Sequence, residues 1–230
     1  MFRRLAAGTV MLGTLSGCPD PNIYGTPRTL APGDIQFQAA IDGYGGTASG
    51  TTGATPGLPS FGARFGLADR LDVGARLIDM TAVGGDAKYN FVRGRFDMAV
   101  DPIVQAYFVL PPQTTTSAAN VGVLQFQLPL LLGINFDDAT TLVFSPGFVA
   151  SVATRSPQGI GLNTEQVAFA SSGLGARLGI GLNIRTSDTF SWQPEVTAWH
   201  EFNGVDSWVC VAGIGINIGA QPDYSDLAPR

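Results

Sequence analysis

The feature that most constrains this chain is an alternation of apolar and polar residues with a period of two, which continues over most of the chain after residue 33. Phe61, Phe65 and Leu67, for example, alternate with Gly62 and Arg64. Such alternation is typical of β-strands with one apolar and one polar face. It predicts an all-β chain of about ten strands, within a range of roughly 8–12. The predicted strands span residues 34–42, 60–67, 71–78, 86–93, 95–109, 121–136, 140–153, 165–183, 189–200 and 208–219.

Many of these strands are long for a globular protein. Several reach or exceed the roughly 9–11 residues that a tilted strand needs to cross a membrane, whereas strands in globular proteins average about 5–6 residues. Charged residues make up 13% of the chain, well below the roughly 25% typical of a soluble domain, and the mean hydropathy is +0.19. The longest apolar stretch after residue 18, at 128–134, contains Pro129 and is much shorter than the roughly 18 residues of a transmembrane helix. Together these features predict strands that cross a membrane.

The connections between the predicted strands alternate in length. The second, fourth, sixth and eighth connections are tight turns, at residues 68–70, 94, 137–139 and 186–188. The odd-numbered connections are longer, at 43–59, 79–85, 110–120, 154–164 and 201–207. Short turns at one end and long loops at the other are typical of closed barrels that span a membrane, and an even strand count places both ends of the barrel at the short-turn side. We expect the long loops 43–59, 110–120 and 154–164 to form an adaptable surface for a protein partner in the cell envelope.

The first eighteen residues have the parts of a secretory signal peptide. Met1-Phe2-Arg3-Arg4 is followed by an apolar run over residues 5–14 and by Leu15-Ser16-Gly17-Cys18. This ending resembles the lipobox of bacterial lipoproteins. The resemblance implies cleavage before Cys18, a covalent diacylglycerol and N-acyl chain (palmitate) on that residue, and a mature protein anchored in a membrane. The expected organisation is a signal peptide at 1–17, a flexible tether at 18–33, a barrel at 34–219 and a polar C-terminal tail at 220–230.

The segment FGARFGLADRLDVGARL, at residues 61–77, resembles the hairpins of small bacterial outer-membrane β-barrel proteins. The resemblance extends over residues 34–219 and implies a closed antiparallel up-and-down transmembrane β-barrel. It also implies a location in the bacterial outer membrane, with the anchored terminus on the periplasmic side. A soluble lipocalin-like ligand-binding lipoprotein is the alternative, because its strands alternate with the same period but face their apolar residues inward.

Three features favour an apolar exterior over an apolar interior. Many positions on the polar face are glycine, and these small residues suit a narrow lumen. Examples are Gly62, Gly66, Gly213 and Gly215. Aromatic residues recur near the ends of the predicted strands, where the interfaces of a membrane lie. Charges within strands fall almost entirely on the polar face, and an arginine or lysine facing the middle of a bilayer costs about 2–4 kcal/mol.

The polar face carries charges of both signs, and these are the residues expected to face the lumen. One interpretation is a set of internal ion pairs that fills a small barrel. The other is a path for a charged solute, but opposite charges neutralise each other and no ring of one sign is evident. The predicted lumen-facing residues are Arg64, Asp72, Arg76, Asp86, Lys88, Asp97, Asp101, Arg177 and Glu195.

Four prolines, Pro102, Pro129, Pro146 and Pro194, fall within predicted strands. A proline cannot donate a hydrogen bond to the strand ladder, so we expect a bulge or a weak point at each of these positions.

Residues that carry out chemistry are scarce. His200 is the only histidine, and Cys210 is the only cysteine besides Cys18, so neither a metal site nor a nucleophile with a neighbouring base is predicted. The net charge of −5 and the absence of a basic cluster argue against nucleic acid as a partner. We expect no enzymatic activity, no cofactor and no metal. The predicted function is structural or interaction-based, with membrane lipid as a partner, and a narrow channel for small solutes is the alternative.

Overall fold

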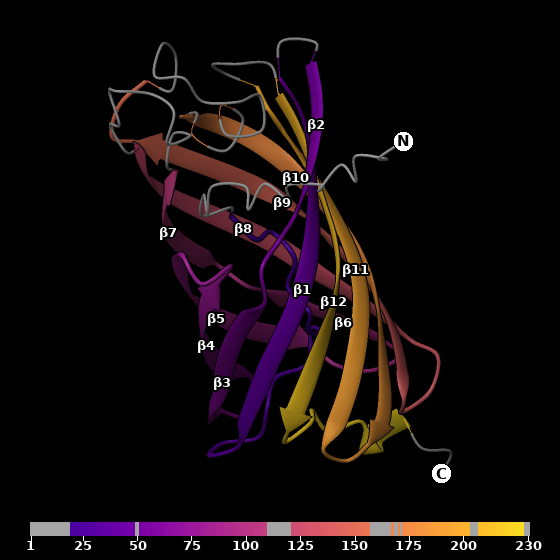
Figure 1. Ribbon diagram of the computed structural model, residues 1–230. Helices are drawn as coiled ribbons and strands as arrows, with labels where there is room; N and C mark the ends of the chain where they lie inside the picture. Colours follow the sequence, from indigo (N-terminus) through magenta and orange to yellow (C-terminus); the bar gives the residue numbers. More distant parts are fainter. Residues whose placement is uncertain are drawn as a thin grey trace, which may run out of the picture.

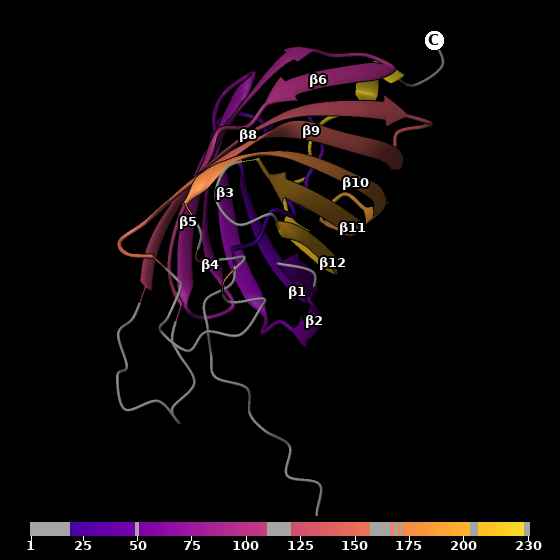
Figure 2. The same ribbon diagram turned by 90° about the horizontal axis from the view of Figure 1, so that it is seen from above.

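Figures 1 and 2 show the computed structural model of the chain, which describes residues 19–48, 51–109, 121–156, 167, 170, 172–202 and 207–227. Within these residues, twelve strands form one antiparallel sheet that closes where β1 pairs with β12. The predicted signal peptide and Cys18 lie outside the described residues. The strands are β1 (Ile35–Ala48), β2 (Thr51–Pro56), β3 (Ser60–Ala68), β4 (Leu71–Ile78), β5 (Ala82–Val92), β6 (Phe96–Val100), β7 (Ile103–Val109), β8 (Val121–Asn135), β9 (Thr140–Ala153), β10 (Gly173–Ser187), β11 (Phe190–Glu201) and β12 (Ser207–Gly219).

The twelve described strands make up a barrel wall of ten strands, because two of the wall strands are each interrupted once and so count as two. β2 and β3 are separated by residues 57–59, and both pair with β1. β6 and β7 are separated by Asp101 and Pro102, and both pair with β5 and β8. The predicted closed antiparallel barrel of about ten strands is therefore confirmed. Of the four strand prolines, Pro102 breaks its strand, whereas Pro129, Pro146 and Pro194 stay inside β8, β9 and β11.

The two ends of the barrel differ. The turns between β3 and β4, β5 and β6, β8 and β9, and β10 and β11 lie at one end, where β1 begins and β12 ends; we call this the turn end. We call the opposite end the loop end. Two of the predicted long loops are shorter there than expected. Most of loop 43–59 is a hairpin of β1 and β2, and loop 79–85 is a tight turn in which the Thr81 N–H donates to the Ile78 carbonyl at 3.0 Å.

Apolar side chains cover the outside of the barrel. Phe148 is 68% exposed, and Phe37 and Ile41 are each 58% exposed, whereas Asp72 and Asp101 are 0% exposed on the inner face. This orientation is the reverse of a soluble lipocalin-like barrel, whose apolar residues would fill the interior. The chain therefore has the fold of an outer-membrane β-barrel, with a hydrocarbon-compatible exterior and a polar interior. None of the helices within the described ranges is long and apolar enough to span a membrane.

The segment that precedes β1 lies inside the barrel, and we call residues 19–33 the plug. Residues 19–30 are buried except for Gly25, which is partly exposed, and residues 31–33 are exposed at the turn end. The plug runs from Gln105, in the half of the wall toward the loop end, down to Gly33, whose N–H donates to the Gly66 carbonyl at 2.9 Å. The prediction of a flexible tether is therefore wrong for these residues. The plug forms no helix or strand, it bends at Gly25 and Pro27, and Tyr24 has a φ of 52°. The polar wall supplies partners that fix this irregular segment in place.

A cluster of apolar residues lies inside the barrel toward the loop end. We call this cluster the apolar layer; it includes Tyr44, Ile78, Tyr107, Val121, Trp199, Val209 and Val211. Buried polar residues such as Glu201 and Ser207 lie at the same end. The described lumen is therefore polar over the length of the plug and more apolar toward the loop end.

Candidate functional site

Polar side chains of the barrel wall bind the main chain of the plug. The amide of Gln105 on β7 accepts from the N–H of Asp20 at 3.1 Å and donates to the carbonyl of Asp20 at 2.5 Å. The carboxylate of Glu195 on β11 accepts from the N–H groups of Ile23 and Tyr24, at 2.9 Å and 2.8 Å. One wall residue thus binds both main-chain groups of a plug residue, and another binds two consecutive N–H groups.

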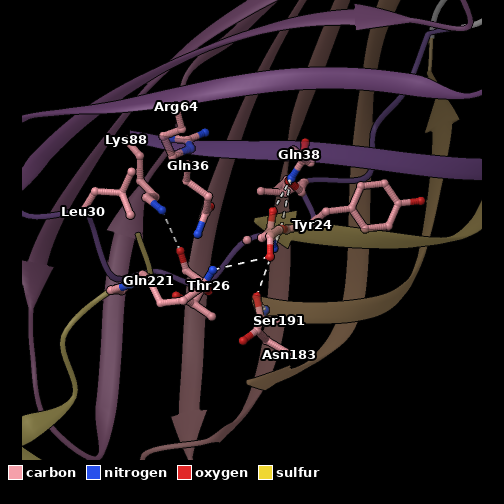
Figure 3. Close-up of a pocket in the computed structure, with 14 residues that line it drawn as sticks. Tyr24, Thr26, Leu30, Gln36, Gln38, Arg64, Lys88, Asn183, Ser191 and Gln221 are labelled. Carbon is pink, nitrogen blue, oxygen red and sulfur yellow. Dashed lines mark hydrogen bonds between the residues drawn. The ribbon is translucent and has the colours of Figure 1, made fainter. Parts of the chain in front are cut away.

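Charged residues continue this recognition toward the turn end. The contacts pair a cationic side chain with a carbonyl, or a carboxylate with an N–H, so each main-chain group meets a charge of the opposite polarity. Figure 3 shows the Lys88 contact with Thr26, together with Gln38 donating to the Tyr24 carbonyl at 3.1 Å. The three charged contacts are Arg76 to the Asn22 carbonyl at 2.7 Å, Lys88 to the Thr26 carbonyl at 2.9 Å, and the Leu30 N–H to Asp72 at 3.0 Å.

The wall is shaped around the ring of Tyr24. This side chain is fully buried, and its hydroxyl donates to the carboxylate of Asp42 on β1. The Asn22 amide donates to the same carboxylate at 2.8 Å. Gly213 and Gly215 of β12 face the ring so closely that a Cβ atom at either position would overlap atoms of Tyr24. The two glycines therefore provide the space in which the ring lies.

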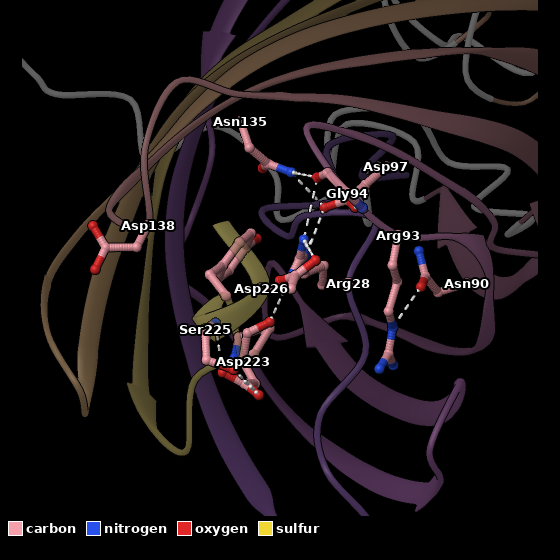
Figure 4. A network of polar contacts seen from close by, with 12 residues as sticks. Arg28, Asn90, Arg93, Gly94, Asp97, Asn135, Asp138, Asp223, Ser225 and Asp226 are labelled. Carbon is pink, nitrogen blue, oxygen red and sulfur yellow. Dashed lines mark hydrogen bonds and ion pairs between the residues drawn. The ribbon is translucent and has the colours of Figure 1, made fainter. Parts of the chain in front are cut away.

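Arg28 holds the plug at the turn end (Figure 4). Its guanidinium lies 2.7 Å from the carboxylate of Asp97 on β6 and 2.5 Å from that of Asp226 in the C-terminal tail. It also lies over the ring of Tyr224, 4.3 Å from the ring centroid. The hydrogen bond from Arg28 keeps the pKa of the Asp226 carboxyl below its usual value. The plug and the tail therefore bind each other at the turn end.

Five of the nine predicted lumen charges form one cluster on β3 to β5 and beside β6. Arg64 hydrogen-bonds to Asp72 and Asp86, and its guanidinium lies 3.9 Å from the carboxylate of Asp101. The Lys88 ammonium lies 3.5 Å from the carboxylate of Asp72. All five side chains are buried except that of Arg64, which is 17% exposed.

The other four predicted charges are also buried in the lumen; of these, Arg76 lines a small cavity together with Arg64 and Asp86 of the cluster. Arg76 and Glu195 bind the plug main chain as described above, and Arg76 lies 3.6 Å from the Asp20 carboxylate. Asp97 binds Arg28, whereas Arg177 donates to Gln127 at 2.9 Å. The described lumen thus contains local ion pairs and plug contacts in place of a ring of one sign.

Little free space remains beside the plug. One cavity of about 20 Å³ lies between the plug and the wall and is shown in Figure 3. A second cavity of about 20 Å³ lies among wall residues, including Gln36, Arg64 and Arg76. A cavity of this size holds about one water molecule, so neither of these two cavities admits a larger solute.

Most of the plug contacts are not predicted by the sequence pattern. Asp20, Tyr24 and Arg28 were assigned to a tether, and Asp42 and Gln105 were not singled out among the strand residues. The plug has no period that marks it as structured, and its partners lie up to 198 positions away in the chain. The available signal was the presence of charged and aromatic residues, four positions apart, in a segment otherwise typical of a linker.

His200 lies near the loop end, where its ring stacks on Trp208 with the centroids 4.5 Å apart and its Nδ1 lies 3.0 Å from the Ser207 carbonyl. Within the described part of the chain, no group of three or more histidine, cysteine or acidic residues is arranged to hold a metal ion. The polar side chains of the wall bind the main chain of the plug inside the lumen.

No protein-family model and no curated protein sequence matches this chain. Among solved structures it is similar to Neisserial surface protein A, with 9% identity, 80% of this chain and 96% of that chain covered, and a TM-score of 0.43. It is similar to Ail, the attachment invasion locus protein of Yersinia pestis, with 10% identity, 82% and 99% coverage, and a TM-score of 0.40. It is also similar to the outer membrane protease OmpT from Escherichia coli, with 7% identity, 83% and 98% coverage, and a TM-score of 0.43. The likeness is one of barrel architecture, and no residue role follows from it.

Proposed function

We propose that this protein is a bacterial outer-membrane β-barrel that is sealed by its own plug and has a structural or interaction-based role. The observation that carries the proposal is the plug, whose residues 19–30 fill the lumen and bind residues of β1, β4, β5, β6, β7 and β11. The apolar layer lies on the loop side of the plug. A barrel closed in this way presents its surface, and not its interior, to other molecules.

Location in the outer membrane is supported by the apolar exterior. Without water, the backbone groups of a sheet must all pair within the protein, so only closed barrels cross a bilayer as strands. The β1–β12 pairing closes this sheet, and large apolar residues such as Phe148 and Ile41 cover its outside.

The β1–β2 hairpin supports the interaction role. It extends past the point where β1 pairs with β3, and Figure 1 shows it projecting at the loop end. Part of the predicted adaptable surface is thus a defined hairpin. The predicted loop 110–120 and most of loop 154–164 lie outside the described residues.

The experiment that tests the sealed state is conductance of the full-length protein in planar lipid bilayers. We expect no discrete steps above the lipid background, because the cavity between the plug and the wall holds about one water molecule. The control is the same preparation after boiling, and folding is checked by the difference in gel migration between boiled and unboiled samples.

A narrow channel is the second candidate, and the polar wall favours it. If the plug leaves the lumen, buried charges such as Arg76 and Asp101 face an aqueous path. Steps in the wild-type protein that disappear in Arg76→Ala or Asp101→Ala would support the channel and contradict the sealed barrel.

The lipid anchor is a proposal that rests on the lipobox resemblance at Cys18, which lies outside the described residues. The neighbouring Pro19, at which the described residues begin, is buried. Intact-mass measurement of the wild-type protein and of Cys18→Ala tests the anchor. We expect the mass of three acyl chains and a glycerol on the wild-type protein alone, and equal masses after correction for the substitution would contradict it.

A further inference from the structure

We propose that the lumen is a binding site for a polypeptide segment supplied by another molecule, and that the plug is the intramolecular occupant of this site. The inference goes beyond a sealed barrel, because it assigns a ligand class to the interior. It rests on the way in which the wall contacts the plug.

The wall residues hydrogen-bond to the main chain of the segment that occupies the lumen. Gln105 binds the N–H and the carbonyl of one residue, and Glu195 binds two consecutive N–H groups. Arg76, Lys88 and Asp72 bind three further main-chain groups, so buried wall residues follow the plug from Asp20 to Leu30. Main-chain groups are the same in every polypeptide except at proline, so these contacts do not require the sequence of the plug.

Side-chain contacts add a preference at three positions. Asp20 lies 3.6 Å from Arg76, the ring of Tyr24 fills the space at Gly213 and Gly215, and Arg28 lies 2.7 Å from Asp97. The preferred occupant is thus a segment with an acidic residue, an aromatic residue and a basic residue at intervals of four, which adopts the path of the plug with Tyr24 at a φ of 52°.

The wall does not depend on the plug for its strand pairing. Each barrel strand pairs with both neighbours through its own ladder, and the plug contributes to no strand. Among the described residues, the plug hydrogen-bonds to main-chain carbonyls of the barrel at the turn end, from Gly33 to Gly66, from Thr29 to Asp69 and from Arg28 to Gly94, and none of these bonds belongs to a strand ladder. A closed barrel with an empty lumen therefore keeps its sheet.

The exposed residues 31–33 allow the proposal to be tested on the full chain. A protease site is inserted between Ala31 and Pro32, the protein is folded in detergent, and the site is cut after folding. The plug is then held only by non-covalent contacts. A fluorescent synthetic peptide of residues 19–33 is added, and binding is followed by anisotropy while gel migration reports the closed barrel.

We expect the labelled peptide to replace the cleaved plug, saturably and with one peptide per barrel. In Glu195→Ala and Gln105→Ala proteins we expect the affinity to fall at least about tenfold, because each change removes two hydrogen bonds. N-methylation of Ile23 and Tyr24 in the peptide should weaken binding to the wild-type wall and have little effect on the Glu195→Ala wall. A peptide with Tyr24→Ala and Arg28→Ala should bind more weakly than the parent but still at the same site.

Three results would overturn the proposal. The first is a closed, cleaved barrel that loses its plug and binds no labelled peptide. The second is peptide binding that is unchanged in Glu195→Ala and Gln105→Ala, which would place the peptide elsewhere. The third is unfolding of the barrel when the plug leaves, which would make the plug a part of the fold and not a ligand.

Discussion

Tyr24 and the two glycines that face it show how single residues fix the plug. β12 alternates apolar outward residues with inward ones, and at 213 and 215 the inward residue is glycine. In a narrow lumen the missing side chains leave room for one aromatic ring. The buried hydroxyl of that ring then finds its partner in Asp42, which avoids an unsatisfied polar group.

We predict that Gly215→Ala displaces the Tyr24 ring. A methyl group at this position overlaps the ring, and overpacking of a buried site costs about 1–3 kcal/mol. Hydrogen exchange by mass spectrometry should show faster exchange over residues 19–30 in the variant, while β12 keeps its protection. Gly43→Ala is the matched control, because a Cβ at Gly43 meets only the Ala212 carbonyl, at 3.8 Å. Equal protection of the plug in Gly215→Ala and wild type would show that Tyr24 does not need this space.

The strands and the plug differ in how far their sequence determines them. β4 and β9 begin and end where the alternation predicts. In a strand with an apolar outer face and a polar inner face, the order of apolar and polar residues fixes which side chains face inward, and so fixes the register. β5 begins at Ala82, four residues before the predicted start, because Gly84 and Gly85 are typical of a loop. The plug could not be predicted in this way, since its partners are wall residues far away in the chain.

The β1–β2 hairpin was missed for a related reason. Its residues are largely glycine, threonine and alanine, and these lack the apolar alternation that marks a strand in contact with lipid. The hairpin projects at the loop end, where such a face is not needed. Its base is held by Asp79 in the β4–β5 turn, whose carboxylate accepts from the Leu58 N–H at 2.8 Å.

We predict that the base of this hairpin loses protection as the pH rises. Burial raises the pKa of the Asp79 carboxyl to about 6. An acid with a raised pKa in the folded state contributes stability below its unfolded pKa, near 4, and this stability is lost as the pH rises through about 6. Hydrogen exchange over residues 56–60, corrected for the intrinsic pH dependence, should be slower at a pH of about 4 than at about 8. Asp79→Asn should remove the difference, and a difference that persists in this variant would assign the effect to another group.

At the scale of the whole molecule, the orientation of the sheet follows from where its charges lie. Eight of the nine predicted lumen residues come from six strands, the ninth, Asp101, lies between β6 and β7, and the closed sheet turns all of them to one interior. Period-two alternation predicts that such residues share a face, but it does not say what occupies the interior. The plug, the tail and the apolar layer together fill a space that ten strands enclose, and their contacts join residues that are distant in sequence.

The same orientation yields a prediction for the exterior. Ile41 lies near the middle of β1, is 58% exposed and pairs with Ile214 of β12. Ile35 lies at the start of β1, at the turn end, and is 49% exposed. A lysine on the lipid face costs about 2–4 kcal/mol at the bilayer midplane and about 0–1 kcal/mol near the interface.

Ile41→Lys should therefore lower the free energy of unfolding in liposomes by about 2–4 kcal/mol, and Ile35→Lys by no more than about 1 kcal/mol. The measurement is guanidinium unfolding in phosphatidylcholine vesicles, followed by tryptophan fluorescence, with the same variants in detergent micelles as a reference. The cost should depend on depth in vesicles, because only a bilayer has a hydrocarbon midplane of fixed position. Equal small costs for both substitutions in vesicles would mean that water contacts Ile41, and the outer surface would then not be the lipid-facing surface of a membrane barrel.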